Sequence, residues 1–400
     1  MDYTPPTHRR LNWHYIAMQA GYWAAFASIV AFQTPLLLTR GFTNTEIGLV
    51  VAVRCGAGIV CQPLLGGFAD RHPNIPLKFI VSASLTLSLL VGLLFTFVPM
   101  GLAGTLAVFI ILGGFEISAY PLMDAMAIQY INAGVPIRYS LGRGIGSFSY
   151  AVSCILLGLQ ADAAGVESTL FTHAALVVLV ILLCMTYPTF RAQPHPAGMQ
   201  EGRPQSVFSL LRGNPRFTLM LAATLVGMTA CLPASNFMVN ILMDKGGSGS
   251  DLGPALFMMA AFELPTAFFF QRLLRKFGSG KLLLLSMVFV TLKAFATSLA
   301  FSPATVLLVQ PLQMLGYGLF TPASVFFVNE SVPAADRVRG QTVMMVASNG
   351  LGGMLAGLVG GRLLDLGGAS LMLGACIGLG VLSALLGIVA LRWKPLAERA

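Results

Sequence analysis

The stretch LMLGACIGLGVLSALLGIVAL at residues 371–391 contains no charged side chain and no proline. It is long enough to cross a hydrocarbon core of about 30 Å as a single helix. Similar runs recur along the chain, for example VSASLTLSLLVGLLFTFV at residues 81–98. Because these runs are predominantly apolar and do not alternate strictly with polar residues, they indicate membrane-spanning helices and not the strands of a barrel. The chain is therefore predicted to be an all-α membrane protein.

The composition of the whole chain supports this prediction. Of its 400 residues, 56% are hydrophobic and only 10% are charged, and the mean hydropathy is +0.79. A soluble protein carries about 25% charged residues, so this chain lacks the material for a hydrated surface. This balance excludes a soluble enzyme, a disordered protein and a nucleic-acid binder, in spite of the net charge of +9.

Twelve spans are predicted, separated by breaks that carry proline, glycine or charge. The N-terminus, the even-numbered connections and the C-terminus, together with the span ends that adjoin them, hold 18 of the 24 lysines and arginines. The odd-numbered connections hold only Arg40, Lys245 and Arg362. Since cytoplasmic loops carry the excess of Lys and Arg, both termini are predicted to be cytoplasmic. The spans are placed at 13–39, 46–69, 77–99, 101–130, 140–161, 168–188, 216–243, 251–273, 280–301, 304–329, 338–361 and 369–391.

A proline-rich, polar and basic segment divides these spans into six and six. We interpret residues 189–215 as a cytoplasmic central loop between an N-terminal six-helix bundle at 1–188 and a C-terminal six-helix bundle at 216–400. Similar features recur at matching places in the halves, such as an Asp and a Gly at the ends of spans five and eleven. Repeated six-helix bundles suggest a transporter whose substrate site lies near the midplane, between the halves.

Two stretches resemble a known family. The segments IGLVVAVRCGAGIVCQPLLGGFADR at 47–71 and GRGIGSFSY at 142–150 resemble the major facilitator superfamily. Within it they are similar to the lactose permease-like cluster of oligosaccharide and nucleoside proton symporters, and the resemblance covers essentially the whole chain. It implies a secondary active transporter that takes up a sugar, an oligosaccharide or a nucleoside with protons, by alternating access.

Three acids and three lysines or arginines fall inside the predicted spans away from their ends, and each is a functional candidate because burying a charge at membrane depth is costly. They are three acids and three bases, so they suggest mutual neutralisation across a central cavity. For each of them a purely structural ion pair is the alternative, and most of all for the base on span two. The six residues are Glu116, Asp124, Glu263, Arg54, Arg143 and Lys293.

Asp124 and Arg143 lie on consecutive predicted spans joined by a short connection. An acceptor-only carboxylate and a rigid fork of donors are suited to bind the vicinal hydroxyls of a sugar. The resemblance implies that the matching acid and arginine bind the sugar, and that an aromatic residue seven positions after the arginine stacks on its ring. That position is Tyr150 here, where the family usually has Trp. A salt bridge that orders the connection is the alternative interpretation.

Polar side chains at helical spacing mark several further spans. Any one of them is more often a helix–helix hydrogen bond than a ligand contact. Taken together, they predict a hydrogen-bonding cavity with aromatic walls, which suits a polyol or nucleoside better than a hydrophobic drug. The further predicted substrate contacts are Gln19, Tyr22, Glu116, Tyr120, Asn236, Asn240, Gln313 and Tyr317.

Proton coupling is where the chain departs from the resembled symporters. Those use a His and a Glu on helix ten, and the matching positions here hold Gln313 and Gly316, which do not titrate. Glu263 and Lys293 fall where the family has an acid on helix eight and a base on helix nine, so we predict them to be the proton-coupling pair. In this hypothesis the substrate displaces Lys293 and lets Glu263 take up the proton. Uniport or another coupling ion stays open.

The other expectations concern gating, partners and alternatives. Asp70 and Arg71, in the turn after span two, and Arg54 are predicted to be gating residues. The six cysteines have no paired spacing and no hydrolase or P-loop motif is found, so no enzyme, metal or cofactor is expected. The expected partners are a small-molecule substrate, protons and the lipid bilayer of a bacterial-type inner membrane, with the protein as a monomer. A proton-coupled importer of organic acids and an efflux antiporter for drugs or metabolites are the alternatives.

Overall fold

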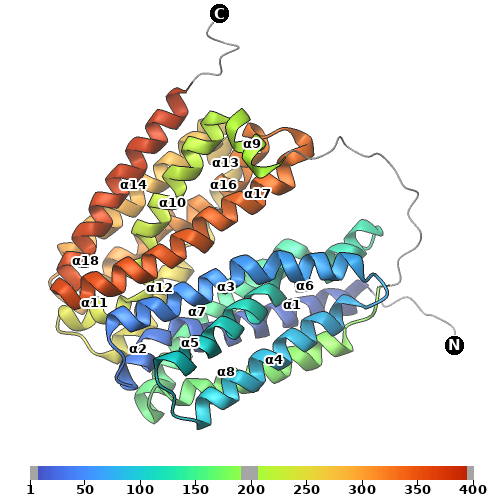
Figure 1. The fold of residues 1–400 in the computed structure, drawn as a ribbon, viewed down its shortest axis with the longest axis horizontal. Coiled ribbons are helices and arrows are strands. Elements are labelled where there is room, and N and C mark those ends of the chain that lie inside the picture. The colour runs from blue at the N-terminus through green and yellow to red at the C-terminus, as the bar shows by residue number, and fades with distance from the viewer. Residues whose placement is uncertain (1–7, 191–205, 394–400) are drawn as a thin grey trace, which may run out of the picture. The chain divides into compact units, whose positions relative to one another are not determined.

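The computed structural model describes residues 8–190 and 206–393. Within these residues every regular element is a helix and no strand occurs (Figure 1). In the same ranges, nine helices are long and apolar enough to cross a membrane, or up to eleven if each of two bent helix pairs is one span. The prediction of an all-α membrane protein is confirmed.

The described residues divide into two compact units. Those within Met1–Phe42 and Gly56–Pro196 form the first unit, and those within Thr43–Cys55 and Ala197–Ala400 form the second. The long helix α3 (Asn44–Arg71) therefore contributes its first turns to the second unit and its remaining turns to the first.

Nine further elements build the first unit. They are the α-helices α1 (His8–Phe26), α2 (Gln33–Thr39), α4 (Leu77–Phe97), α5 (Leu102–Ile111), α6 (Ile117–Asn132), α7 (Tyr139–Ala164) and α8 (Ser168–Thr186), and the π-helices η1 (Ala27–Ala31) and η2 (Leu112–Glu116). Helix α1 packs along α7 and α8, and α4 packs against α6 and α8. Tyr15, Met18, Met123 and Tyr187 are buried in the core between these helices.

The second unit contains fourteen elements besides the start of α3. Its α-helices are α9 (Val207–Gly213), α10 (Pro215–Asn236), α11 (Met238–Asp244), α12 (Leu252–Ala261), α13 (Leu264–Phe277), α14 (Ser279–Ser298), α15 (Pro303–Val309), α16 (Tyr317–Ser331), α17 (Arg337–Met345) and α18 (Gly353–Arg392). The shorter 3₁₀- and π-helices are η3 (Gly249–Asp251), η4 (Gln310–Met314), η5 (Ala334–Asp336) and η6 (Val346–Gly352). Helix α10 packs along α18, and α14 packs against α16 and α18. Within the predicted central loop, α9 is helical and residues 191–205 lie outside the described part of the chain.

Several predicted spans are bent or interrupted in the structure. The span predicted at 13–39 bends by 40° after η1, the one at 251–273 bends by 57°, and the one at 304–329 is broken by η4. A proline lacks the backbone N–H, so it fits the first turn of a helix, whereas in a helix interior it removes a backbone hydrogen bond. Interior prolines occur here at Pro63, Pro121, Pro233 and Pro322. Prolines lie in the first turns of α2, α13 and η4, at Pro35, Pro265 and Pro311.

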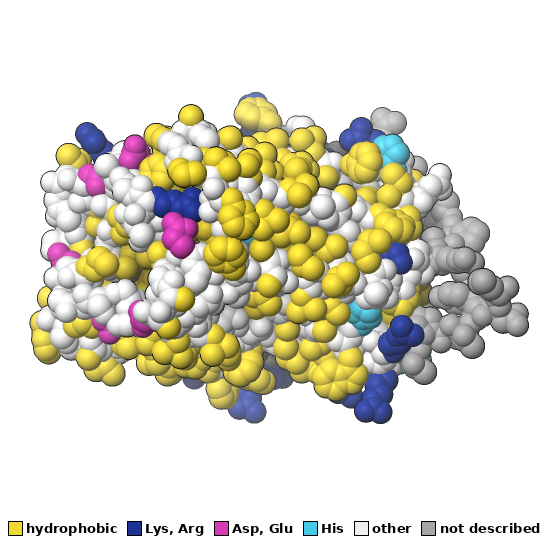
Figure 2. All heavy atoms as spheres, turned by 90° about the horizontal axis from the view of Figure 1, so that it is seen from below, with side chains coloured by type: hydrophobic (Ala, Val, Ile, Leu, Met, Phe, Trp, Pro, Cys, Tyr) yellow, Lys and Arg dark blue, Asp and Glu magenta, His cyan; other side chains and the backbone are white. Residues whose placement is uncertain are grey.

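The surface carries many exposed apolar side chains. Hydrophobic side chains cover much of the face drawn in Figure 2. Phe268, Phe301 and Leu308 are among the most exposed of the large hydrophobic residues. Exposed apolar surface on this scale is unfavourable in water and is expected where helices face lipid.

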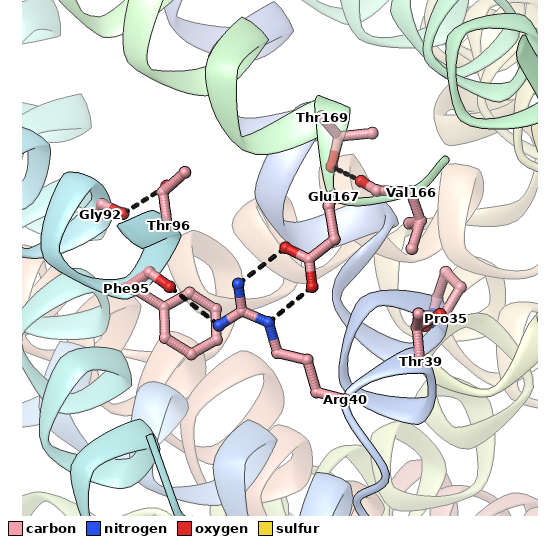
Figure 3. Close-up of polar contacts among 9 residues, drawn as sticks. All are labelled: Pro35, Thr39, Arg40, Gly92, Phe95, Thr96, Val166, Glu167 and Thr169. Atoms are coloured by element: carbon pink, nitrogen blue, oxygen red, sulfur yellow. Dashed lines mark hydrogen bonds and ion pairs between the residues drawn. The ribbon is translucent and has the colours of Figure 1, made fainter. Parts of the chain in front are cut away.

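Arg40 ties together one end of the first unit (Figure 3). Its Nε and Nη2 donate to the two carboxylate oxygens of Glu167, at 2.8 and 2.7 Å. Its Nη1 donates to the main-chain carbonyl of Phe95 at 2.9 Å, and its guanidinium carbon lies 3.9 Å from the centroid of the Phe95 ring. The Phe95 carbonyl belongs to the last turn of α4, where carbonyls lack helical partners. One side chain thus joins the end of α2, the end of α4 and the start of α8.

Candidate functional site

The carboxylate of Asp124 on α6 is the centre of a hydrogen-bond cluster in the first unit. Its Oδ1 accepts from the Tyr15 hydroxyl and from Gln19 Nε2, each at 2.8 Å. Its Oδ2 accepts from the Tyr139 hydroxyl at 2.9 Å and from Arg143 Nη1 at 3.4 Å. The predicted approach of Asp124 to Arg143 is thus present. A carboxylate offers about four acceptor positions, so these four donors occupy its capacity.

Close contact between α1 and α7 makes this cluster possible. Tyr15 and Gln19 are four residues apart on α1 and so lie on one face of that helix. A Cβ built at Gly142 would lie 2.5 Å from the Tyr15 ring, and one built at Gly146 would lie 2.5 Å from the Trp23 ring. Because glycine has no Cβ, α7 approaches α1 closely enough for Tyr139 and Arg143 to reach Asp124.

The Arg143 guanidinium lies over one member of a cluster of aromatic rings. Its central carbon lies 4.6 Å from the centroid of the Tyr120 ring, within the range of a cation–π contact. Tyr22 stacks on Tyr120 at 5.7 Å, and Trp23 meets Tyr120 and Tyr150 edge-on at 5.2 and 6.4 Å. The Arg143 side chain is still 37% exposed and uses one N–H on Asp124. It therefore keeps donors for a ligand beside the aromatic rings.

Glu116 does not join this cluster. Its carboxylate lies 3.3 and 3.4 Å from Nε2 of His173 on α8, and the two side chains are only 3% and 1% exposed. The π-helix η2 ends at Glu116, and the Tyr22 hydroxyl donates to the Glu116 main-chain carbonyl at 3.0 Å. His173 is absent from the sequence prediction. Its signal was an ionisable residue inside the apolar span 168–188.

In the second unit, an amide bridges the predicted coupling pair. Lys293 Nζ donates to Gln313 Oε1 at 2.8 Å, and Gln313 Nε2 donates to Glu263 Oε1 at 2.9 Å. The displacement hypothesis assumes a direct ion pair between Glu263 and Lys293. No such pair is present among the described residues, because Gln313 bridges the two side chains. The break in the predicted span 304–329 explains the difference, because Gln313 lies in η4 and its side chain enters between the two charges.

Two other polar side chains on the predicted list bind protein groups in the second unit. The Tyr317 hydroxyl donates to Asn349 Oδ1 in η6 at 3.2 Å. Asn240 Nδ2 donates to Asn44 Oδ1 at 2.7 Å. Asn236 ends α10 and is half-buried.

The start of α3 is held by Asp365 of α18. Its Oδ1 accepts from the main-chain N–H and the side-chain amide of Asn44, at 3.2 and 2.9 Å. Its Oδ2 accepts from the main-chain N–H and the hydroxyl of Thr45, at 2.7 and 2.5 Å. A carboxylate at a helix N-terminus satisfies free N–H groups and complements the helix dipole.

The predicted gating residues show no ion pair with another described residue. Asp70 and Arg71 are exposed at the end of α3, and Arg71 Nε donates to the carbonyl of Gly67, one turn earlier in the same helix. Arg54 is 8% exposed, and its Nε is buried without a hydrogen-bond partner. The three predicted acids and three predicted bases do not form three ion pairs among the described residues, since Glu116 faces His173 and Arg54 has no acid within ion-pair distance.

A model of the MFS_1 like family matches residues 11–375. The chain belongs to this family of major facilitator superfamily transporters. It is 25% identical to a maltose permease of Geobacillus stearothermophilus over 353 residues, which cover 86% of each chain. The crystal structure of the nucleoside transporter NupG covers 96% of this chain and all of its own, with a TM-score of 0.82 and 16% identity. An auto-inhibited POT family peptide transporter covers 97% of this chain and 98% of its own, with a TM-score of 0.72 and 11% identity.

These likenesses agree with the apolar helices. The chain is a multi-pass membrane transporter of small molecules and not an enzyme. The likeness to the solved structures is one of fold.

Proposed function

We propose that the protein is a secondary active transporter that takes up a small, hydroxyl-rich solute together with protons, by alternating access. The sugar, oligosaccharide and nucleoside classes all fit this description. The observation that carries the proposal is the Arg143 guanidinium, which Asp124 holds beside Tyr120 while leaving it partly exposed. Relatives named for maltose and nucleoside transport support the same solute class.

In this proposal the solute binds to Arg143 and the aromatic rings, and Asp124 holds Arg143 in place. The free N–H groups of a guanidinium donate to hydroxyl, ether or carbonyl oxygens, and the Tyr120 and Tyr150 rings pack against the apolar face of a sugar or base. Asp124 has no free acceptor position unless one of its four donors leaves. A gain of solute contact at Asp124 during transport would therefore require a change in the Tyr15 or Tyr139 contact.

The proposal includes twelve spans, with a six-helix bundle at 1–188, a cytoplasmic loop at 189–215 and a six-helix bundle at 216–400. Both termini are cytoplasmic, and the protein is a monomer in a bacterial-type inner membrane. The count of twelve spans is supported by the segment that contains α17, η6 and α18. This segment is one candidate span in the structure, although it covers 56 residues. The backbone inside α18 leaves the helical region at Gly367 and at Gly368, whose φ is +68°. Counted as two spans, this segment raises the total from eleven to twelve.

Coupling is assigned to Glu263, through Gln313 to Lys293. Protonation of the Glu263 carboxylate would remove the negative end of this hydrogen-bonded row and release the amide to rotate. One charge moved through 100 mV supplies about 2.3 kcal/mol, and one pH unit supplies about 1.4 kcal/mol. One proton is therefore enough for roughly tenfold accumulation.

The test is uptake of radiolabelled sugars and nucleosides by proteoliposomes, with and without an imposed pH gradient. Arg143→Ala should abolish uptake, and Glu263→Gln should keep solute exchange but lose the response to the gradient. Arg138→Ala is the matched control, because Arg138 is an exposed arginine at the start of the same helix, α7. Uptake that ignores the pH gradient in the unchanged protein would refute proton symport. Full uptake by Arg143→Ala would refute the site.

A further inference from the structure

Among the described residues, Arg54 and Lys293 are the only lysine or arginine residues that are more than nine-tenths buried. Asp124 and Arg143 are within ion-pair distance, Glu116 faces His173, and Glu263 and Lys293 share Gln313. Each of these three groups joins one acid with one base. Arg54, on α3, has no acid partner within ion-pair distance among the described residues.

The Arg54 charge cannot be removed by the protein itself. A guanidinium does not lose its proton in proteins, so its positive charge is not removed by deprotonation. An unpaired charge taken out of water costs several kcal/mol. The side chain is more than nine-tenths buried, and its buried Nε donates to no acceptor. The positive charge therefore calls for an anion from outside the chain.

Lipid headgroups are too far away to supply that anion. Arg54 lies ten residues after Asn44, where α3 begins, and 17 residues before Arg71, where it ends. At 1.5 Å per residue, these separations are about 15 and 25 Å. Half of a hydrocarbon core is also about 15 Å. Arg54 is thus near the depth at which transporters hold their solutes.

Next to Arg54, α3 makes a tight helix contact within the second unit, and polar side chains lie close to that contact. The next residue, Cys55, packs against Gly353, since a Cβ built there would lie 2.9 Å from the cysteine sulfur. Gly353 directly follows the π-helix η6, in which Asn349 accepts a hydrogen bond from Tyr317. Single turns of π-helix occur frequently at functional sites. The turn of α3 that carries Arg54 therefore lies beside a polar irregularity of the second unit.

We propose that Arg54 binds a carboxylate of the transported solute, so that the solute is a hydroxylated monocarboxylate of the sugar-acid class. The inference rests on the proposed function, because it names the charge of the solute that this transporter carries. A planar carboxylate matches the guanidinium fork in a bidentate way. One unpaired positive charge also matches one carboxylate, whereas a phosphate monoester carries between 1.5 and 2 negative charges at about pH 7 and leaves an excess. A monoanion carried with one proton moves no net charge.

The first test measures anion binding without transport. The purified full-length protein is unfolded thermally in detergent with acetate or with acetamide, which has nearly the same shape and no charge. Acetate, but not acetamide, should raise the unfolding temperature, and Arg54→Gln should lose this effect. Arg362→Gln should keep it, because Arg362 is an exposed basic residue of α18. An equal effect of acetamide, no effect of acetate, or an acetate effect that survives in Arg54→Gln would each overturn the proposal.

The anion-free protein gives a second measurement. An unpaired buried charge destabilises the fold, so Arg54→Gln and Arg54→Met should unfold at the same or a higher temperature than the unchanged protein. A clear loss of stability in both variants would reveal a partner for Arg54 inside the chain, and would refute the inference. Arg54→Lys keeps the charge and loses the fork, so its half-saturating acetate concentration should rise about tenfold.

Uptake separates this inference from the proposed function. Proteoliposomes are given labelled glucuronate or labelled glucose, with an imposed pH gradient or with a membrane potential set by potassium and valinomycin. Gradient-driven uptake of glucuronate that does not respond to the potential is the expected result. Gradient-driven uptake of glucose in preference to glucuronate would keep the proposed function and overturn the role of Arg54. Uptake of neither, combined with Arg54-dependent binding of acetate, would count against the proposed function and not against the anion site.

Discussion

Removing Arg40 should destabilise the first unit by about 3 kcal/mol. The ion pair with Glu167, whose carboxylate side is 43% exposed, contributes about 1 kcal/mol, as partly exposed pairs do. The hydrogen bond from a charged donor to the Phe95 carbonyl contributes about 1.5 kcal/mol. The contact of the guanidinium with the Phe95 ring contributes about 0.5 to 1 kcal/mol. Glu167→Gln should therefore cost only about 1 kcal/mol.

The assay is equilibrium unfolding in mixed micelles with a rising mole fraction of dodecyl sulfate. The chain has three tryptophans, of which Trp13 and Trp23 lie on α1 in the first unit. In a Trp393→Phe background, tryptophan fluorescence therefore reports on the first unit. Arg362→Ala is the control and should change the free energy of unfolding by less than about 0.5 kcal/mol, as exposed substitutions do.

The comparison of the two variants decides whether the reasoning is right. Arg40→Ala should cost about three times as much as Glu167→Gln, because it also removes the two Phe95 contacts. If both variants lose the same free energy, the carbonyl and the ring contribute nothing and Arg40 is an ordinary surface ion pair. Arg40→Lys should fall between them, because an ammonium cannot donate in the same fork geometry.

Two further predictions concern buried contacts of the first unit. His173→Leu leaves the Glu116 carboxylate buried without a partner, so it should cost about 3 to 5 kcal/mol. Adding Glu116→Gln should recover most of that loss in dodecyl sulfate unfolding, because the amide carries no charge; a double variant as unstable as His173→Leu would contradict this. Gly146→Ala places a Cβ 2.5 Å from the Trp23 ring and should lower the free energy of unfolding by about 1 to 3 kcal/mol. The control Gly144→Ala has nothing within 4 Å of its new Cβ, so it should be neutral or stabilising. Equal effects of the two variants would refute the packing argument.

Much of the architecture was available from the sequence because the deciding properties are local. Whether a run of about twenty residues can cross a membrane depends on its own length and polarity. The same holds for the ionisable residues inside the spans, which stand out against an apolar background. The approach of Asp124 to Arg143 was also predictable, since the two lie on consecutive helices with a short connection. The prolines of α2, α13 and η4 were visible in the sequence, but the size of the two measured bends was not, because a bend depends on what each half of the span packs against.

The partners of the buried charges were decided only by the tertiary structure. Helical periodicity tells which side chains share a face, but not which face of another helix meets it. His173 lies 57 positions from Glu116, and Gln313 lies 20 from Lys293 and 50 from Glu263. An equal number of acids and bases suggested complete pairing, yet His173 took up one acid and left Arg54 without a partner. Charge counts along a chain are sums over residues, whereas neutralisation requires atoms within a few ångströms, and only the packing of the helices brings them there.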